Sequence, residues 1–206
     1  MVGNVSRAQS KDEQRSPLNL PNALTVLRLI LVPIFLVLAL QDNSIARWTT
    51  LIVFCVAAAT DHFDGKIARS YGIVTDFGRI ADPIADKALT LGAFVILSVT
   101  EFVPWWFTVV IAVRELGITV MRSVFLRRGI VVSANMGGKL KTVLQMFFIF
   151  LLLIPWDLFL SYSVVELLAI YFIYPVGGAA LFMTVWSGGV YVWEGIALRK
   201  KNHSMI

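Results

Sequence analysis

Four aspartates are spaced so that they could act together on a metal ion. Asp61 and Asp64 are three residues apart, and the second pair, Asp82 and Asp86, is four apart. Either spacing puts both carboxylates of a pair on one face of a helix. Four converging carboxylates would repel one another, and one or two divalent ions would remove that repulsion. All-oxygen ligation favours Mg²⁺, Mn²⁺ or Ca²⁺ over zinc, so the pattern predicts such a metal centre.

The ordinary alternative is a solvated loop in which each aspartate pairs with a nearby cation. For a single aspartate that interpretation would be the better one. The candidate partners are Lys66, Arg69, Arg79 and Lys87. These four aspartates, however, lie between two long apolar segments, where ionised groups are costly and usually serve a function. The metal site is therefore the stronger hypothesis.

The chain that carries these aspartates has the composition of a membrane protein. Its 206 residues are 58% hydrophobic and 15% charged, whereas soluble domains carry about a quarter charged residues. A spanning helix needs roughly 20 mostly apolar residues. The candidate runs are 23–40, 48–60 continuing toward 69, 83–100, 102–126, 140–156 and 164–198. We therefore expect an all-α polytopic membrane protein with six transmembrane helices, the last of which Pro175, Gly177 and Gly178 could kink or divide.

Basic residues indicate how these helices would be oriented. Lys and Arg concentrate in cytoplasmic segments, and six crossings with the N-terminus inside leave only Arg47 in an outer loop. A seventh crossing would put the basic C-terminal residues outside. We therefore expect a cytoplasmic tail or interfacial helix over residues 1–19, a six-helix membrane domain over 20–198 and a cytoplasmic basic tail over 199–206.

The overall charge and the cysteine content limit the possible partners. The net charge of +5 fits attraction to anionic lipid headgroups. Basic and aromatic residues do not interleave on one polar surface, so nucleic acid is not an expected partner. The single cysteine, Cys55, excludes an intrachain disulfide. The polar first segment lacks the apolar core of a cleavable signal peptide.

Small and basic residues continue the helical face of the first aspartate pair. Gly65 follows Asp61 by one turn and would let a ligand approach the helix closely. Ala68 has a small side chain and so leaves room for a ligand beside Gly65. Ordinary helix packing explains both small residues equally well. The guanidinium of Arg69 is planar and presents paired N–H donors that suit phosphate oxygens. This face is thus suited to a phosphate-bearing ligand.

Together these residues form one pattern, Asp61-x2-Asp64-Gly65-x2-Ala68-Arg69-x8-Gly78-x3-Asp82-x3-Asp86. The pattern resembles the signature of the CDP-alcohol phosphatidyltransferase family. The resemblance implies a six-helix membrane enzyme, usually a homodimer, with a polar cavity open to the cytoplasm. It also implies two Mg²⁺ or Mn²⁺ ions held by the four aspartates, with Asp86 as general base. The implied contacts to CDP-diacylglycerol are Asn22, Thr25, Gly65, Ala68, Arg69, Thr75 and Gly78, although a helix N-cap explains Asn22 equally well.

The reaction implied by this resemblance is a direct transfer. The acceptor hydroxyl attacks the β-phosphorus of CDP-diacylglycerol, and CMP leaves. Metal ions would clamp the pyrophosphate while a carboxylate takes the proton of the hydroxyl. No covalent intermediate is needed. Phosphohistidine chemistry at His62 is the weaker hypothesis, because His62 lies about 100° around the helix from Asp61.

Basic residues in the second half of the chain indicate the acceptor. Arg114 lies mid-span, too deep for its charge to reach the membrane surface by simple snorkelling. Arg122 follows about two turns later, and Lys139 and Lys141 open the fifth apolar run. Burial of so many cations favours an anionic acceptor such as a phosphorylated alcohol. Pairing of Arg114 with Glu115 is the alternative.

Two stretches of this half are specific enough for comparison, Arg114-Glu115-x6-Arg122 and Ser133-Ala134-Asn135-x2-Gly138-Lys139-x-Lys141-Thr142-x2-Gln145. They are similar to those of the bacterial phosphatidylglycerolphosphate synthase branch of the family. This similarity implies a bacterial plasma-membrane enzyme whose acceptor, sn-glycerol 3-phosphate, binds Arg114, Arg122, Lys139 and Lys141. Residues 157–206 are expected to add little beyond apolar character.

Other acceptors and another class of protein are the alternatives. A cardiolipin synthase or a phosphatidylinositol-phosphate synthase would use the same chemistry on a different anionic alcohol. A cation-coupled transporter would need polar breaks through the full depth of several helices. The unbroken apolar stretch 147–154 makes the transporter a remote alternative.

Overall fold

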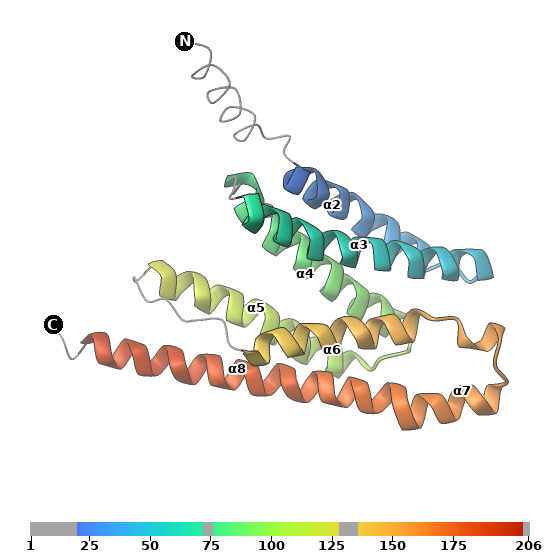
Figure 1. The fold of residues 1–206 in the computed structure, drawn as a ribbon. Coiled ribbons are helices and arrows are strands. Elements are labelled where there is room, and N and C mark those ends of the chain that lie inside the picture. Colours follow the sequence, from blue (N-terminus) through green and yellow to red (C-terminus); the bar gives the residue numbers. More distant parts are fainter. Residues whose placement is uncertain (1–19, 72–75, 128–135, 204–206) are drawn as a thin grey trace, which may run out of the picture. The chain divides into compact units, whose positions relative to one another are not determined.

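The described part of the protein is all-helical. This computed structural model describes the backbone of residues 20–71, 76–127 and 136–203, and the side chains within 23–60, 84–126 apart from Asp86, and 136–198. That part contains six helices of 18 residues or more (Figure 1). They are α2 (Leu20–Ala39), α3 (Ser44–Tyr71), α4 (Asp76–Val99), α5 (Trp105–Arg127), α6 (Met136–Leu153) and α8 (Tyr174–His203). The expected all-α fold is confirmed, whereas the tail expected over residues 1–19 lies outside the described residues.

Each apolar run identified in the sequence forms one of these helices. Among the described residues, the segments Met136–Leu158 and Tyr162–Leu198 are long and apolar enough to cross a membrane. Shorter apolar stretches are Ala23–Ala39, Ser44–Thr60 and Lys87–Val99. In α3 and α4 the helix continues beyond the apolar stretch into the residues that carry the aspartates.

The last apolar segment stays helical from Tyr162 to His203. Helix α7 (Tyr162–Leu168) continues through a π-helical turn, Ala169–Ile173, directly into α8. Pro175 has no N–H to donate to the carbonyl one turn earlier, and a wider turn accommodates a proline in this way. Pro175 is therefore accommodated within a continuous helix, and the segment is not divided there.

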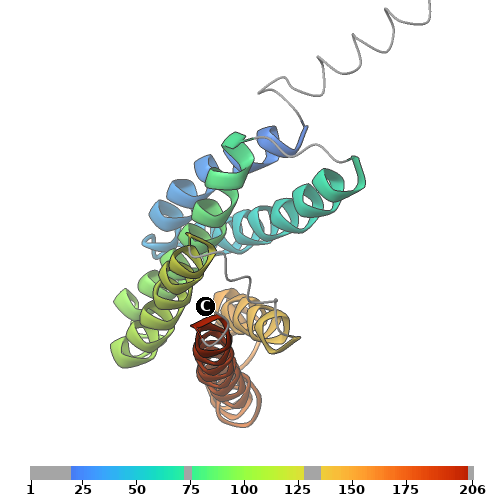
Figure 2. The same cartoon turned by 90° about the vertical axis from the view of Figure 1, so that its left-hand side faces the viewer.

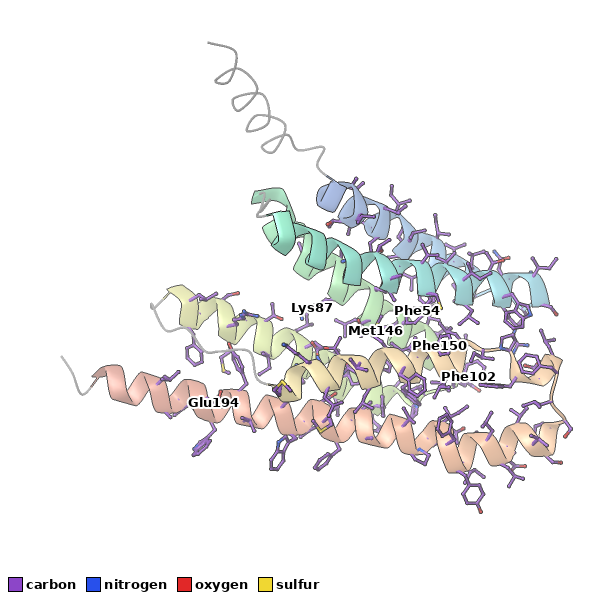
Figure 3. The ribbon with its side chains drawn as sticks, in the orientation of Figure 1. Phe54, Lys87, Phe102, Met146, Phe150 and Glu194 are labelled. Atoms are coloured by element: carbon purple, nitrogen blue, oxygen red, sulfur yellow. The ribbon has the colours of Figure 1, made fainter. Side chains whose placement is uncertain are left out.

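The first of two compact units comprises residues 1–93. Its helices α2 and α3 pack along each other (Figure 1), and the rings of Phe35 and Phe54 lie 5.8 Å apart between their centroids. Phe54 is labelled on α3 in Figure 3. The side chain of Asn43 caps the start of α3, because its Oδ1 accepts a hydrogen bond of 2.8 Å from the backbone N–H of Ala46. This unit carries both aspartate pairs.

The second unit comprises residues 94–206 and is built on α5, α6 and α8. Helices α6 and α8 run side by side (Figure 2). Aromatic rings pack between the end of α4, α5 and α6: the centroid of Phe107 lies 5.8 Å from that of Phe94 and 5.6 Å from that of Phe148. On α8, Gly195 leaves room for the ring of Phe125 of α5, which a Cβ at residue 195 would overlap. Close helix packing of this kind is common among membrane helices.

Candidate active site

The four aspartates lie on two consecutive helices. Asp61 and Asp64 are in the last turns of α3, and Asp82 and Asp86 are in the first turns of α4. Because the backbone is helical at both places, each pair shares one helix face, as the spacing predicts. The donor set of four carboxylates suits Mg²⁺ or Mn²⁺.

The positions of these side chains lie outside the described residues, so their convergence on metal stays a prediction. The same holds for most of the expected nucleotide contacts, for which the structure describes the helical backbone but not the side chain: Asn22, Gly65, Ala68, Arg69 and Gly78. Thr75 lies outside the described residues altogether.

Helix α2 contributes a buried polar face to the first unit. Thr25, one of the expected nucleotide contacts, is 1% exposed, and Arg28 on the next turn is 0% exposed. A buried guanidinium needs compensating charge or hydrogen bonds, so an arginine at this depth is a functional candidate. Arg28 is not among the site residues expected from the sequence, although a single arginine within an apolar run was the signal that could have identified it.

A buried ionic cluster joins α5 to α6 in the second unit. Glu115 Oε1 accepts a hydrogen bond of 3.0 Å from Arg114 Nη1, and the same oxygen accepts one from Lys141 Nζ. The side chains of Arg114, Glu115 and Lys141 are only 14%, 10% and 6% exposed. We call these three residues the Glu115 cluster. Two cations thus share one carboxylate within the cluster.

Helix α8 supplies further partners to this cluster. Arg114 Nε donates to the carbonyl oxygen of Thr184 at 3.1 Å, and Arg114 Nη2 donates to Ser187 Oγ at 2.8 Å. Gln145 Nε2 of α6 donates to Thr184 Oγ1 at 2.9 Å. Thr184 and Ser187 are both buried. The expectation that residues 157–206 add little beyond apolar character is therefore wrong.

A glycine on α8 makes room for the arginine. A Cβ at Gly188 would lie 3.2 Å from Arg114 Cγ and 3.3 Å from Arg114 Nε. The guanidinium can therefore lie against the backbone of α8, where the Thr184 carbonyl and the Ser187 hydroxyl accept its protons.

The structure brings together two of the four residues expected to bind the acceptor phosphate. Arg114 and Lys141 share the carboxylate of Glu115, and the pairing of Arg114 with Glu115 is the one that the sequence offered as an alternative. Arg122 and Lys139 are exposed, and neither forms a hydrogen bond or ion pair with another described residue. Spacing along the chain did not distinguish these two situations, because the difference arises from packing.

The arrangement in the second unit is suited to binding an anion. The two cations of the Glu115 cluster are buried among the helices α5, α6 and α8. In such surroundings the attraction for a phosphate is stronger than in water. After Gln145, α6 is apolar to its end at Leu153. Met146 and Phe150 of this part, labelled in Figure 3, lie one turn apart.

Comparison with known proteins identifies the class. A family model described as CDP-alcohol phosphatidyltransferase matches residues 18–188 of this chain. The match covers both aspartate pairs and the whole of the Glu115 cluster with its partners on α8. The chain belongs to this family of membrane-bound enzymes.

Individual relatives share most of their length with the chain. A Mycobacterium tuberculosis protein named probable phosphatidylglycerophosphate synthase is 44% identical over 177 residues, which cover 84% of this chain and 80% of the relative. The Bacillus subtilis CDP-diacylglycerol–glycerol-3-phosphate 3-phosphatidyltransferase is 37% identical over 196 residues, covering 86% and 97%. A Salmonella typhimurium protein of the same name is 35% identical over 174 residues, covering 82% and 90%.

Proposed function

We propose that this protein transfers the phosphatidyl group of CDP-diacylglycerol to sn-glycerol 3-phosphate, giving phosphatidylglycerol phosphate and CMP. The observation that carries the proposal is the similarity, over nearly the whole chain, to relatives named for this reaction. The two buried cations of the Glu115 cluster support an acceptor that is itself a phosphate.

On the donor side, the four aspartates of α3 and α4 would hold one or two Mg²⁺ or Mn²⁺ ions. Bound metal neutralises charge on a pyrophosphate and on the oxygen that leaves it. Arg69 supplies a fork for phosphate oxygens. Gly65 and Ala68 let the nucleotide approach α3 closely, and the remaining contacts come from Asn22, Thr25, Thr75 and Gly78.

On the acceptor side, the cations of the second unit bind the phosphate of glycerol 3-phosphate. Arg114 and Lys141 form the buried part of this site, and the exposed Arg122 and Lys139 attract the anion from solvent. Asp86 takes the proton from the acceptor hydroxyl, whose oxygen then attacks the β-phosphorus. The bond from that phosphorus to the CMP oxygen breaks, and CMP leaves with the electron pair.

The membrane arrangement belongs to the same proposal. Six crossings with both termini in the cytoplasm put nearly all basic residues on the cytoplasmic side. The reaction would then take place at the cytoplasmic face of a bacterial plasma membrane, in a homodimer. Labelling of single cysteines introduced at Asn43 and Asn202 in intact cells tests the topology: a membrane-impermeant reagent should modify the first and spare the second. The native Cys55 is replaced in this background.

The acceptor is tested by following CMP release from purified enzyme. The protein in detergent receives CDP-diacylglycerol with one of four acceptors: glycerol 3-phosphate, inositol 1-phosphate, inositol or phosphatidylglycerol. We expect metal-dependent CMP release with glycerol 3-phosphate alone. Turnover with phosphatidylglycerol or inositol 1-phosphate would instead indicate one of the two alternative synthases and refute the proposed acceptor. Folded protein that released no CMP with any acceptor would refute the enzymatic function.

A further inference from the structure

We propose that Glu115 is a positioning residue for the acceptor, which holds Lys141 and Arg114 where they bind the acceptor phosphate. The proposal rests on the proposed function, because it assigns Glu115 to the acceptor side of that reaction. In the sequence, Glu115 stood only as a member of the compared stretch and as an alternative partner of Arg114, and it was not among the predicted acceptor residues.

The first argument is geometric. A single oxygen of Glu115, Oε1, accepts hydrogen bonds from both cations, one on its own helix and one on α6. The carboxylate is therefore the point at which the two cations are held together. An arginine and a lysine have long flexible side chains, and fixing both requires a shared partner in the interior.

The second argument concerns charge. Without the carboxylate, two buried cations would repel each other in surroundings of low polarity. With it, the two cations are held beside a carboxylate, which offsets their mutual repulsion. Glu115 therefore allows Arg114 and Lys141 to lie close together before the acceptor binds.

The third argument is the rigidity of the rest of the network. Arg114 is also held on α8 by the Thr184 carbonyl and by Ser187. Lys141 belongs to α6 and is linked to α5 through Glu115. Loss of the carboxylate removes the link from Lys141 to α5, while Arg114 keeps its contacts to α8. The expected defect is local to the acceptor side.

The test is the Glu115→Gln variant, which keeps the shape of the side chain and removes its charge. In metal-supplemented CMP-release assays, we expect the KM for glycerol 3-phosphate to rise by about tenfold or more, the size expected for a lost charged hydrogen bond. The KM for CDP-diacylglycerol and the kcat at saturation should change by less than about threefold. The matched control is Ser98→Ala, which removes a buried hydrogen bond of 2.7 Å to Thr108 in the same unit and touches no cation. It should leave both KM values unchanged.

A double-mutant cycle distinguishes positioning from general support of the fold. If Glu115 acts through Lys141, then Glu115→Gln should raise the KM for glycerol 3-phosphate much less in a Lys141→Met background than in the wild type. Equal losses for both substrates, an unchanged KM for glycerol 3-phosphate, or a lowered one would each overturn the proposal.

Failure of the proposed function would look different. The wild-type enzyme would then not turn over glycerol 3-phosphate, whereas failure of the present proposal leaves wild-type turnover intact. Were the wild type to use another anionic acceptor, the same comparison of KM values with that acceptor would test Glu115.

Discussion

The two units of the chain carry their charged residues in different ways. In the first unit, candidate groups recur at helical spacing, with Asp61 and Asp64 on α3 and a second pair on α4. In the second unit, Arg114 is bound by partners on α8 that are 70 and 73 residues away, Thr184 and Ser187. Local spacing is visible in a sequence, whereas a pairing across such a separation arises only when the helices pack. A donor site could therefore be proposed from a motif, whereas the partners of Arg114 on α8 could not.

The largest expected effect tests the first unit. The Asp86→Asn variant removes the proposed general base and a proposed metal ligand while keeping the side chain's size. We expect CMP release to fall by about 10²–10⁴-fold, the usual contribution of a positioned acid or base. The variant should keep the thermal unfolding midpoint of the wild type in detergent, because the asparagine fits the same space.

The control for this variant is an aspartate away from both units' candidate sites. Asp42 is exposed in the turn between α2 and α3, and Asp42→Asn should retain wild-type turnover. Near-normal activity of Asp86→Asn would contradict the assigned role and leave the first unit without a base.

The second effect tests how closely α5 and α8 must pack. An alanine at Gly188 would press its Cβ against Arg114, whereas one at the adjacent Gly189 would meet open space among the described residues. Overpacking of a well-packed interior costs about 1–3 kcal/mol. We therefore expect Gly188→Ala to lower the unfolding midpoint and raise the KM for glycerol 3-phosphate. Gly189→Ala should do neither, and equal behaviour of the two variants would show that Arg114 is free to move aside.

The third effect tests the hydrogen bond between α6 and α8 at Thr184, whose hydroxyl also donates within α8 to the carbonyl of Ala180. Thr184→Val keeps the backbone carbonyl that Arg114 uses but removes the hydroxyl that accepts from Gln145 Nε2. Hydrogen bonds between membrane helices contribute about 0.6 kcal/mol on average and seldom more than about 1.7 kcal/mol. We expect a lowered unfolding midpoint with kcat largely retained.

Its control is a threonine whose hydroxyl bonds only within its own helix. Thr49 Oγ1 donates to the carbonyl of Ile45 on an exposed face of α3, and Thr49→Val should leave the midpoint unchanged. A larger loss for Thr49→Val than for Thr184→Val would argue against the interhelical network as a source of stability.

The limits of prediction from sequence follow from these particular residues. Apolar runs long enough to span a membrane predicted all six long helices, because length and hydropathy are local properties. Thr184 and Ser187 gave no such signal, since small hydroxyl residues are common in membrane helices for packing alone. Glu115 was visible only as a neighbour of Arg114, and its contact with Lys141 depends on how α5 meets α6. The spacing pattern thus made the aspartates candidates, whereas only the packed helices revealed the partners of Arg114 and Lys141.

The smallest expected effect concerns the backbone where α4 ends, a local feature that the sequence did not reveal. Glu101 has a φ of 63°, the left-handed conformation that glycine adopts most readily. The turn is held by a hydrogen bond of 3.0 Å from the N–H of Val103 to the carbonyl of Leu97, so the chain cannot easily relax this angle. Glu101→Gly should therefore raise the unfolding midpoint by an amount equivalent to about 0.5 kcal/mol, since relief of strain exceeds the entropy that glycine adds to the unfolded chain. Glu101→Val, with a branched side chain at the same angle, should lower it, and turnover should be unaffected in both. A midpoint that fell by a similar amount with glycine and with valine would mean that this turn is held by the side chain of Glu101, and that even a short local segment of the second unit depends on packing.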